Sequence, residues 1–141
     1  MTDLETSARK RIALLLDAPL VGQTIRVCGW VRTFRNDRFL AINDGSTLQN
    51  LQLVVDKETT SEEVLKQLHT GTSVEAVGKL VESQGGGQAT ELQVESLNVL
   101  GGADPETFPI QMKRHSLDFL REKAHLRFRT NTFGAVFRVR H

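Results

Sequence analysis

Hydrophobic and polar residues alternate with a period of two along five segments of the chain. In residues 24–34, TIRVCGWVRTF, the positions Ile25, Val27, Gly29 and Val31 share one face, and the segment is rich in β-branched and aromatic residues. Similar patterns occur at residues 38–44, 50–56, 72–83 and 90–100. Turn residues such as Asp44-Gly45-Ser46 separate them. The pattern predicts five β-strands.

A helical pattern lies between the third and fourth predicted strands. In residues 59–71, TTSEEVLKQLHTG, apolar residues recur at helical spacing at positions 64, 65 and 68. Thr60 and Glu63 have the spacing of a capping box, and Gly71 stands at the expected C-cap. A second helical pattern, LETSARKRIALLL at residues 4–16, stops before Pro19. The chain therefore predicts one helix within the strand series and one before it.

The order β-β-β-α-β-β over about 75 residues is typical of the OB-fold. We therefore predict a mainly β protein: a five-stranded Greek-key barrel, with a helix between strands three and four, an N-terminal helix and a helical C-terminal hinge. An open sandwich is the alternative, but mid-strand glycines at positions 29 and 78 favour a curled sheet. QGGGQ (84–88) reads as a hairpin loop, and Pro105 and Pro109 predict an extended linker over residues 101–110.

The last residues, RTNTFGAVFRVRH (129–141), predict a basic amphipathic helix with no glycine or proline to close it. We interpret the chain as part of a longer protein. Without a covering surface, the apolar side chains of residues 111–141 predict a tail that is poorly ordered or packs against another copy. The expected divisions are an N-terminal extension (1–20), the OB-fold domain (21–101), a linker and hinge (102–130) and the start of a further domain (131–141).

Composition adds a charge asymmetry to this picture. The 141 residues are 39% hydrophobic and 25% charged, which is typical of a soluble globular protein. No apolar run predicts a membrane span or signal peptide, so we expect no membrane partner and a cytoplasmic location. The net charge is −5 over residues 1–107 and +6 over residues 108–141. This indicates a polyanionic partner or an acidic protein surface, unless the tail is merely solvated.

The register of the predicted strands places a possible nucleic-acid site on the outer face of the barrel. If the leucines and isoleucine of strands two, three and five point inward, then Phe39, Gln52 and Glu91 point outward, with Arg32 and Arg35 leading into strand two. An aromatic ring can stack on a base, an amide or carboxylate can bind a base edge, and arginines neutralise phosphate. Alternatively, Phe39 plugs a barrel end, and the other two are ordinary surface residues.

No other pattern predicts chemistry. The QGGGQ loop lacks the lysine and hydroxyl residue of a phosphate-binding loop, and His69, His115 and His125 lack ligand spacing. No nucleophile–base pair is evident, and the single cysteine, Cys28, is interpreted as a small packed residue. We therefore predict no catalytic, cofactor or metal site in this chain.

Several longer stretches resemble the N-terminal part of asparaginyl-tRNA synthetase. They are GQTIRVCGWVRTFR, FLAINDGSTLQNLQLVV, ELQVESLNVLG and RHSLDFLREKAHLRFRTNTFGAV, and the resemblance runs from about Gln23 to His141. The motifs GWVRT and NDGS resemble motifs shared by the aspartyl-, asparaginyl- and lysyl-tRNA synthetases of class II. The RTNTFGAV stretch resembles the asparaginyl enzyme, and argues against the aspartyl or lysyl alternative.

The resemblance implies an anticodon-binding role, with the tRNA(Asn) anticodon stem-loop as partner. It implies that Phe39 stacks on the middle anticodon base, that Arg35 and Gln52 hold the same uracil, and that Glu91 faces the first base, a guanine or its modified form. It also implies a full-length homodimeric asparagine–tRNA ligase that uses ATP and Mg²⁺ in a catalytic domain beyond His141. This chain alone should be inactive. The alternative is a stand-alone OB protein that binds single-stranded nucleic acid.

Overall fold

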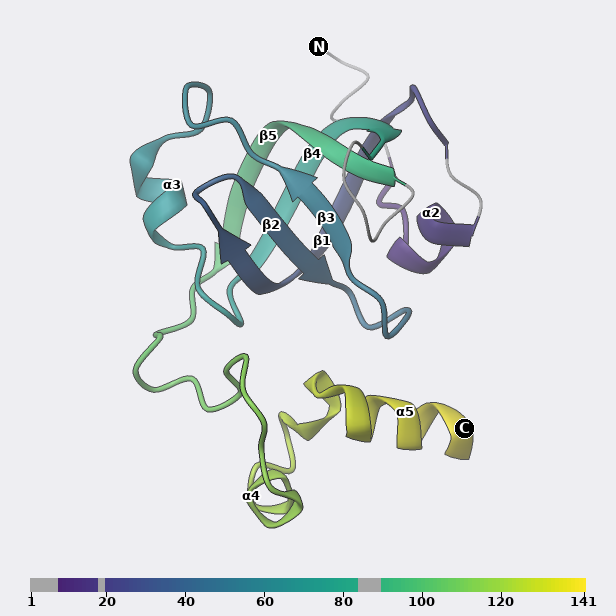
Figure 1. Ribbon diagram of the computed structural model, residues 1–141, viewed down its shortest axis with the longest axis vertical. Helices are drawn as coiled ribbons and strands as arrows, with labels where there is room; N and C mark the ends of the chain where they lie inside the picture. The colour runs from purple at the N-terminus through teal and green to yellow at the C-terminus, as the bar shows by residue number, and fades with distance from the viewer. Residues whose placement is uncertain (1–7, 18–19, 84–89) are drawn as a thin grey trace.

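A computed structural model describes residues 8–17, 20–83 and 90–141, so the expected QGGGQ loop lies outside the described residues. Figure 1 shows a barrel with the C-terminal segment below it. The elements are α2 (Ile12–Asp17), β1 (Thr24–Arg35), β2 (Phe39–Asn43), β3 (Leu51–Val54), α3 (Glu62–Lys66), β4 (Ser73–Glu82), β5 (Thr90–Gly101), α4 (Leu117–Glu122), a 3-10 helix η1 (Arg127–Arg129) and α5 (Asn131–Arg140).

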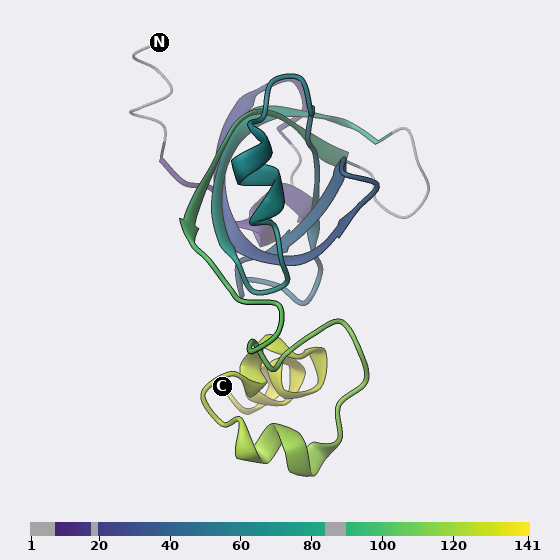
Figure 2. The same ribbon diagram turned by 90° about the vertical axis from the view of Figure 1, so that its left-hand side faces the viewer.

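The five strands close into a ring in the order β1-β2-β3-β5-β4, and β4 pairs back with β1. All neighbouring pairs are antiparallel except β3 and β5, which run parallel. Figure 2 shows the strands as a ring with α3 in front of it. Closure gives each strand a neighbour on both sides, which removes open sheet edges. The predicted OB-fold barrel is confirmed, and the open sandwich is excluded.

Two mid-strand glycines permit the close strand approaches that the curled sheet needs. A Cβ at Gly78 would lie 2.1 Å from the backbone oxygen of Gln93, and one at Gly29 would lie 2.9 Å from that of Asn43. The pairing of β4 with β5 also shifts register at Gly78. A side chain at either position would push the paired strand away. The mid-strand glycines therefore indicated a curled sheet because only glycine fits these close strand approaches.

The inward-facing side chains of the strands meet in one core. Leu40, Ile42, Leu51 and Leu53 are each 0% exposed, as strict alternation along β2 and β3 predicts. Burying one such side chain contributes about 1.5–3 kcal/mol of transfer free energy. The same alternation leaves the intervening residues of these strands on the outer face, where the candidate site lies.

Helix α3 is shorter than the sequence pattern predicts, and both expected caps are wrong. Its N-cap is Ser61, whose backbone is extended and whose hydroxyl accepts from the N–H of Val64 at 3.4 Å. Both serine and threonine are favourable N-caps, with serine preferred, so spacing alone did not decide between the neighbours Thr60 and Ser61. The C-cap is Gln67. Gly71 instead forms a left-handed turn with a φ of 98°, and the Phe108 ring fills the space a Cβ would need.

The N-terminal helix begins at Ile12, later than predicted, and its predicted part at residues 4–7 lies outside the described residues. Before it, the N–H of Lys10 donates to the backbone oxygen of Arg26 at 2.9 Å, so the chain runs beside β1. The first helical N–H groups then donate to Asp44 Oδ2 (2.9 Å) and Ser46 Oγ (3.0 Å). The β2–β3 loop therefore satisfies N–H groups at this helix end, which sequence spacing could not reveal.

Residues 104–108 fold into a turn, so the extended conformation expected for residues 101–110 is wrong. Asp104 accepts from the N–H of Glu106 through Oδ1 and from the N–H of Phe108 through its backbone oxygen, both at 2.8 Å. This Asx-type turn competes successfully with the extended preference of the flanking prolines. It brings Phe108 onto Gly71 and leads to Ile110, which is 6% exposed.

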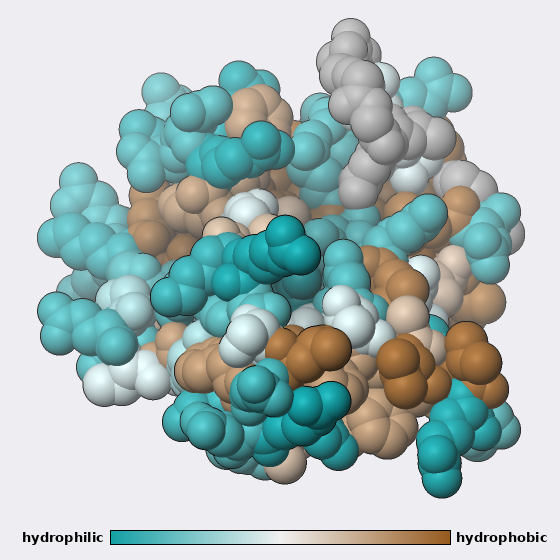
Figure 3. Space-filling model, turned by 60° about the horizontal axis from the view of Figure 1, so that its bottom comes forward, coloured by the Kyte–Doolittle hydropathy of each residue, from teal (hydrophilic) through white to brown (hydrophobic). Residues whose placement is uncertain are grey.

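The C-terminal segment takes a helical structure at one end of the barrel. The helix predicted near residues 129–141 is confirmed as α5, capped by the Thr130 hydroxyl. Arg138 donates to the backbone oxygen of Gly45, and Gly134 packs near the Leu48 side chain. In Figure 3, which views this end, brown apolar side chains lie among the hydrophilic ones. Exposed apolar residues here include Leu117, Phe128, Val136 and Val139. The prediction of poor order or self-association remains to be tested in solution.

Candidate nucleic-acid interface

Strands β2 and β3 set two of the predicted site residues on the outer face of the barrel. Ala41 on β2 is opposite Gln52 on β3, and Phe39 is opposite Val54. Because Leu40 and Leu53 point into the core, these partners point outward. Phe39 and Gln52 are half-buried and diagonally related, so an aromatic ring and an amide share one surface. Phe39 is thus a surface residue of β2, and not a plug at the barrel end.

Glu91 joins this surface from β5, which runs parallel to β3. Its side chain accepts from Gln52 Nε2 at 2.9 Å and from the Ser83 hydroxyl at 3.4 Å, both through Oε2. Glu91 is only 8% exposed, although its neighbours on the outer face, such as Gln93, are exposed. A buried carboxylate held by neutral donors keeps acceptor capacity while fixing the amide that it binds. Ser83 is a neighbour of the candidate site that the sequence analysis missed.

Arg35 lies beside Phe39 because of a β-bulge. The pairing of β1 with β2 shifts register between Val31 and Thr33, so that Arg32 has no opposite residue. Strict alternation from Ile25 would have turned Arg35 inward. After the bulge, Phe34 packs against the core instead, and Arg35 pairs with Phe39 on the outside. The exposed guanidinium of Arg35 is therefore available at the rim of the Phe39 surface.

Arg32 is not brought together with the other predicted residues. Its guanidinium donates to the backbone oxygen of Arg129 in the C-terminal segment, and burial lowers its pKa. The backbone oxygen of Arg32 accepts from the Thr70 hydroxyl at 3.0 Å. The bulge is the physical reason, because it aims this side chain toward the barrel end that the C-terminal segment covers. Arg32 contacts the C-terminal segment in this structure, and not the Phe39 surface.

Arg38 is a second residue that the sequence analysis did not single out. It immediately precedes Phe39, and its guanidinium carbon lies 5.5 Å from the centroid of the Phe39 ring. The sequence signal that could have identified Arg38 is its position directly before an aromatic residue. Their contact depends on the hairpin conformation, which the sequence pattern alone did not specify.

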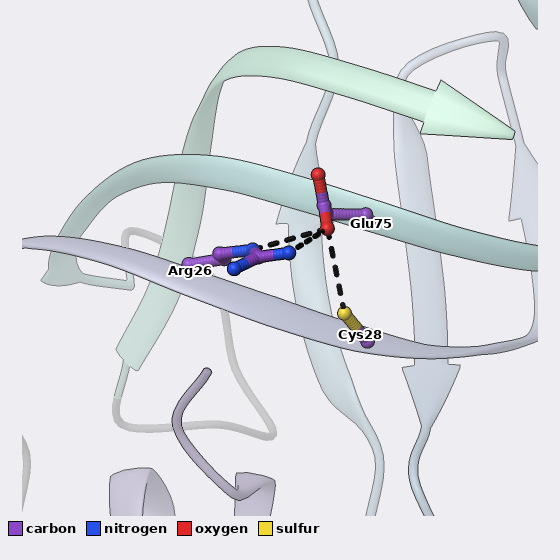
Figure 4. Close-up of polar contacts among 3 residues, drawn as sticks. All are labelled: Arg26, Cys28 and Glu75. Atoms are coloured by element: carbon purple, nitrogen blue, oxygen red, sulfur yellow. Dashed lines mark hydrogen bonds and ion pairs between the residues drawn. The ribbon is translucent and has the colours of Figure 1, made fainter. Parts of the chain in front are cut away.

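A different side of the ring, where β1 pairs with β4, carries a compact polar cluster (Figure 4). Arg26 and Glu75 form an ion pair, with Arg26 Nε 3.0 Å from Glu75 Oε2. The Cys28 thiol lies 4.0 Å from the same oxygen, and burial together with the Glu75 charge raises the pKa of this thiol. A raised pKa disfavours the thiolate at neutral pH, which agrees with the interpretation of Cys28 as a packed residue.

Within residues 8–17, 20–83 and 90–141, no group of three histidine, cysteine or acidic side chains has the arrangement of a metal site. None of the helices in this part of the chain is long and apolar enough to cross a membrane.

Residues 25–100 match the tRNA anti-codon family, described as the OB-fold nucleic acid binding domain. The match covers more than half of the chain and spans the whole barrel. The chain belongs to this family. The fold and the family therefore define it as an OB-fold nucleic-acid-binding domain, with the Phe39 surface on β2, β3 and β5 as its candidate interface.

Comparison with individual proteins agrees with the resemblance seen in the sequence. The chain is 50% identical to an asparagine–tRNA ligase of Parabacteroides distasonis over 141 residues, and 53% identical to that of a Nostoc species over 135 residues. These alignments cover 98% and 93% of this chain but 30% and 29% of the relatives. The chain therefore spans about 30% of the length of the curated relatives it matches.

Solved structures extend the likeness beyond the barrel. Asparaginyl-tRNA synthetase from Pyrococcus horikoshii, complexed with asparaginyl-adenylate, superposes with a TM-score of 0.77 at 26% identity. The superposition covers 94% of this chain and 31% of that one. A putative aspartyl-tRNA synthetase from Leishmania major shares the fold, with a TM-score of 0.73 at 19% identity over 95% of this chain and 30% of that one.

Proposed function

We propose that this chain is the anticodon-binding module of an asparagine–tRNA ligase and that its Phe39 surface binds the anticodon loop of tRNA(Asn). The observation that carries the proposal is the Gln52–Glu91 hydrogen bond of 2.9 Å beside Phe39 on the outer face of an OB barrel. Three residues that the resemblance assigns to the anticodon converge there from three different strands. The sequence relatives are named asparagine–tRNA ligases, which supports tRNA(Asn) as the partner.

Each residue has a distinct chemical role in this proposal. The Phe39 ring stacks on the middle base, whose identity matters little to stacking because every base has a π-face. Gln52 binds the edge of the same base, a uracil, with its amide oriented by Glu91. Arg35 lies at the rim, where it contacts the uracil nucleotide and its phosphate. Arg32 is left out of this set because its guanidinium is engaged by the C-terminal segment.

Glu91 supplies selectivity for the first anticodon base. A carboxylate repels phosphate, so it is unfavourable in a nucleic-acid site unless it accepts hydrogen bonds from a base. The Watson–Crick edge of guanine offers two N–H donors, and Glu91 Oε1 has no hydrogen bond within the described residues. Glu91 therefore favours a guanine, or a modified guanine that keeps those donors.

The whole-protein role follows from the relatives and is part of the proposal. The full-length protein would be a homodimer that activates asparagine with ATP and Mg²⁺ and transfers it to tRNA(Asn) in the cytoplasm. Residues 21–101 would be the RNA-binding domain, residues 102–130 the hinge, and residues 131–141 the start of the catalytic domain. The location of Arg32, Phe108 and Arg129 between barrel and α5 supports a hinge that is packed on the barrel.

A binding titration tests the anticodon assignment. Wild type, Phe39→Ala, Glu91→Ala and Glu91→Gln are titrated at fixed salt against a GUU stem-loop and loops changed at the first or middle base. We expect wild type to prefer GUU. Phe39→Ala should lose roughly 1–3 kcal/mol for every loop whose middle base stacks. Glu91→Ala should reduce the difference in affinity between loops with guanine and loops with another base at the first position. Its effect on overall affinity should be smaller than that of Phe39→Ala.

The control for shape is Glu91→Gln, which keeps the side-chain volume but places an amide donor where the guanine donors arrive. It should reduce the preference for guanine at least as much as Glu91→Ala does. Equal binding of scrambled and GUU loops by all four proteins would contradict the anticodon assignment. In that case a stand-alone OB protein that binds single-stranded nucleic acid would be the better description.

A second experiment concerns catalysis. We expect the purified chain to show no asparagine-dependent exchange of pyrophosphate into ATP, because its sequence contains no recognisable ATP-binding motif. The proposed full-length protein, assayed in parallel, should show this exchange. Exchange by the 141-residue chain itself would overturn the assignment of catalysis to a separate domain.

A further inference from the structure

The β1–β2 hairpin holds two arginines at the edge of the Phe39 ring. Its turn residues, Asn36 and Asp37, both have left-handed backbones, with φ angles of 56° and 51°. The N–H of Arg38 donates to the backbone oxygen of Arg35 at 3.1 Å, which closes a two-residue turn. Asparagine and aspartate tolerate this conformation better than most residues. The tight turn therefore brings Arg35 and Arg38 together at the start of β2, where Arg35 pairs with Phe39.

The hairpin is anchored on its other side by β3. The N–H of Val55 donates to the backbone oxygen of Arg38 at 2.8 Å, and Lys57 Nζ lies 3.1 Å from Asp37 Oδ2. The carboxylate nearest in sequence is thus paired with a lysine, and not with either arginine. Across residues 8–17, 20–83 and 90–141, no carboxylate lies within ion-pair distance of Arg38. Its positive charge is uncompensated and its side chain is exposed.

The Arg38 guanidinium nevertheless has a defined position, because its carbon lies 5.5 Å from the centroid of the Phe39 ring. This cation–π contact holds the charge beside the surface on which a base would stack. A nucleotide stacked on an aromatic ring carries its own phosphate at the edge of that ring. A planar guanidinium is suited to such a phosphate, because it can donate two parallel hydrogen bonds to it.

We propose that Arg38 is a nucleic-acid contact residue that binds the phosphate of the nucleotide stacked on Phe39. The proposal rests on the proposed function, since it takes the Phe39 surface to be the RNA-binding site. Arg38 is aligned on the ring before RNA arrives and contributes to affinity for every sequence. It differs from Glu91, whose effect depends on the base, because a phosphate contact carries no sequence information.

The experiment measures affinity for the GUU stem-loop and for a middle-base substitute over a series of salt concentrations. The proteins are wild type, Arg38→Ala, Arg38→Lys, Phe39→Ala and Arg121→Ala. Arg121 is the matched control, since it is an exposed arginine on α4, at the end of the molecule away from the barrel (Figure 1). Thermal unfolding of each variant establishes that the barrel is intact.

We expect Arg38→Ala to weaken both loops by a similar factor, roughly tenfold at low salt, as for loss of one charge-assisted contact. The dependence of log affinity on log salt should become shallower by about 0.7, the value for one phosphate of a single strand. Arg38→Lys should keep the salt dependence of wild type and recover part of the affinity. Arg121→Ala should resemble wild type more closely in both quantities.

Three results would overturn the proposal, and they have different meanings. If Phe39→Ala weakens binding but Arg38→Ala matches Arg121→Ala, the Arg38 contact is wrong and the anticodon surface stands. If Arg38→Ala weakens binding without changing the salt dependence, Arg38 acts on the ring or base and not on phosphate. If Phe39→Ala also binds like wild type, the Phe39 surface is not the RNA site, and the proposed function fails with it.

Discussion

In the barrel, large side chains such as Leu40, Leu53 and Leu92 are completely buried, at 0% exposure. The C-terminal segment, residues 108–141, is described throughout, and its only buried apolar residues are Ile110 and Leu120. It depends instead on arginines packed against aromatic rings. The Arg129 guanidinium carbon lies 4.3 Å from the Trp30 ring centroid, and that of Arg127 lies within 6 Å of the Phe128, Phe133 and Phe137 rings.

The difference indicates two levels of stability in one chain. Burial of apolar area is the dominant stabilising term, and it is concentrated in the barrel. The segment adds a few cation–π contacts and backbone-directed hydrogen bonds, while Arg32 and Arg127 each have a buried Nε without a partner in the described residues. Such unpaired groups oppose docking. We therefore expect the segment to open locally while the barrel stays folded.

The largest effect should come from the barrel core. Leu53→Ala removes a fully buried side chain, and the resulting cavity should lower the free energy of unfolding by about 2–5 kcal/mol. The matched control is Leu117→Ala in the C-terminal segment, where the side chain is 51% exposed and the change should be within about 0.5 kcal/mol. Chemical denaturation measures both. Equal destabilisation by the two variants would refute the distinction between barrel and segment.

A backbone contact should show a comparable effect without loss of a side chain. Gly78→Ala would place a Cβ 2.1 Å from the Gln93 oxygen, so the β4–β5 pair must separate. We expect a loss of about 3 kcal/mol, as for severe overpacking. In contrast, Gly102→Ala has no atom within 4 Å of the added methyl group and should be nearly neutral. Thermal unfolding of the two variants measures this. An unchanged unfolding temperature for Gly78→Ala would mean that β4 and β5 are packed less closely at Gly78 than described.

The smallest and most local effect should come from the C-terminal segment. Arg129→Ala removes a partly buried cation–π contact with Trp30, worth about 1–2 kcal/mol of docking free energy. Amide exchange in α5 should then become faster, whereas exchange in β1–β5 should hardly change. The control is Arg140→Ala, which removes an exposed arginine of α5 and should alter exchange in neither region. Slow, unchanged exchange in α5 for both variants would show that the segment is held by something other than this contact.

The strand pattern of the sequence was sufficient for the barrel and for the outward orientation of Phe39 and Gln52. Alternation in β2 and β3 correctly separated Leu40 and Leu53 from Phe39 and Gln52, because a strand repeats every two residues and one face must be buried. It failed where the period breaks. The bulge at Arg32 reversed the phase of β1, so that Arg32 contacts the C-terminal segment and Arg35 pairs with Phe39.

Other features depended on contacts between different parts of the fold. Ile12 begins a helix where Asp44, 32 positions away, accepts its N–H. Phe108 packs on Gly71, although two prolines suggested an extended chain over residues 101–110. Ser83 meets Glu91 across β4 and β5, and no local pattern marked that hydrogen bond. Sequence periodicity is insensitive to all three, because it reports only which neighbours along the chain share a face.

The sequence by itself determined the succession of strands along the chain, their buried faces and the residue types on the outer face, because periodicity and side-chain chemistry are local properties. The tertiary structure decided which of those residues meet. Glu91 became a buried acceptor for Gln52 only when the parallel β3–β5 pairing set the two side by side. Arg38 reached Phe39 only through the left-handed turn at Asn36 and Asp37. Distances between strands and the phase of a bulge come from the closed barrel, where packing of the whole ring determines each register.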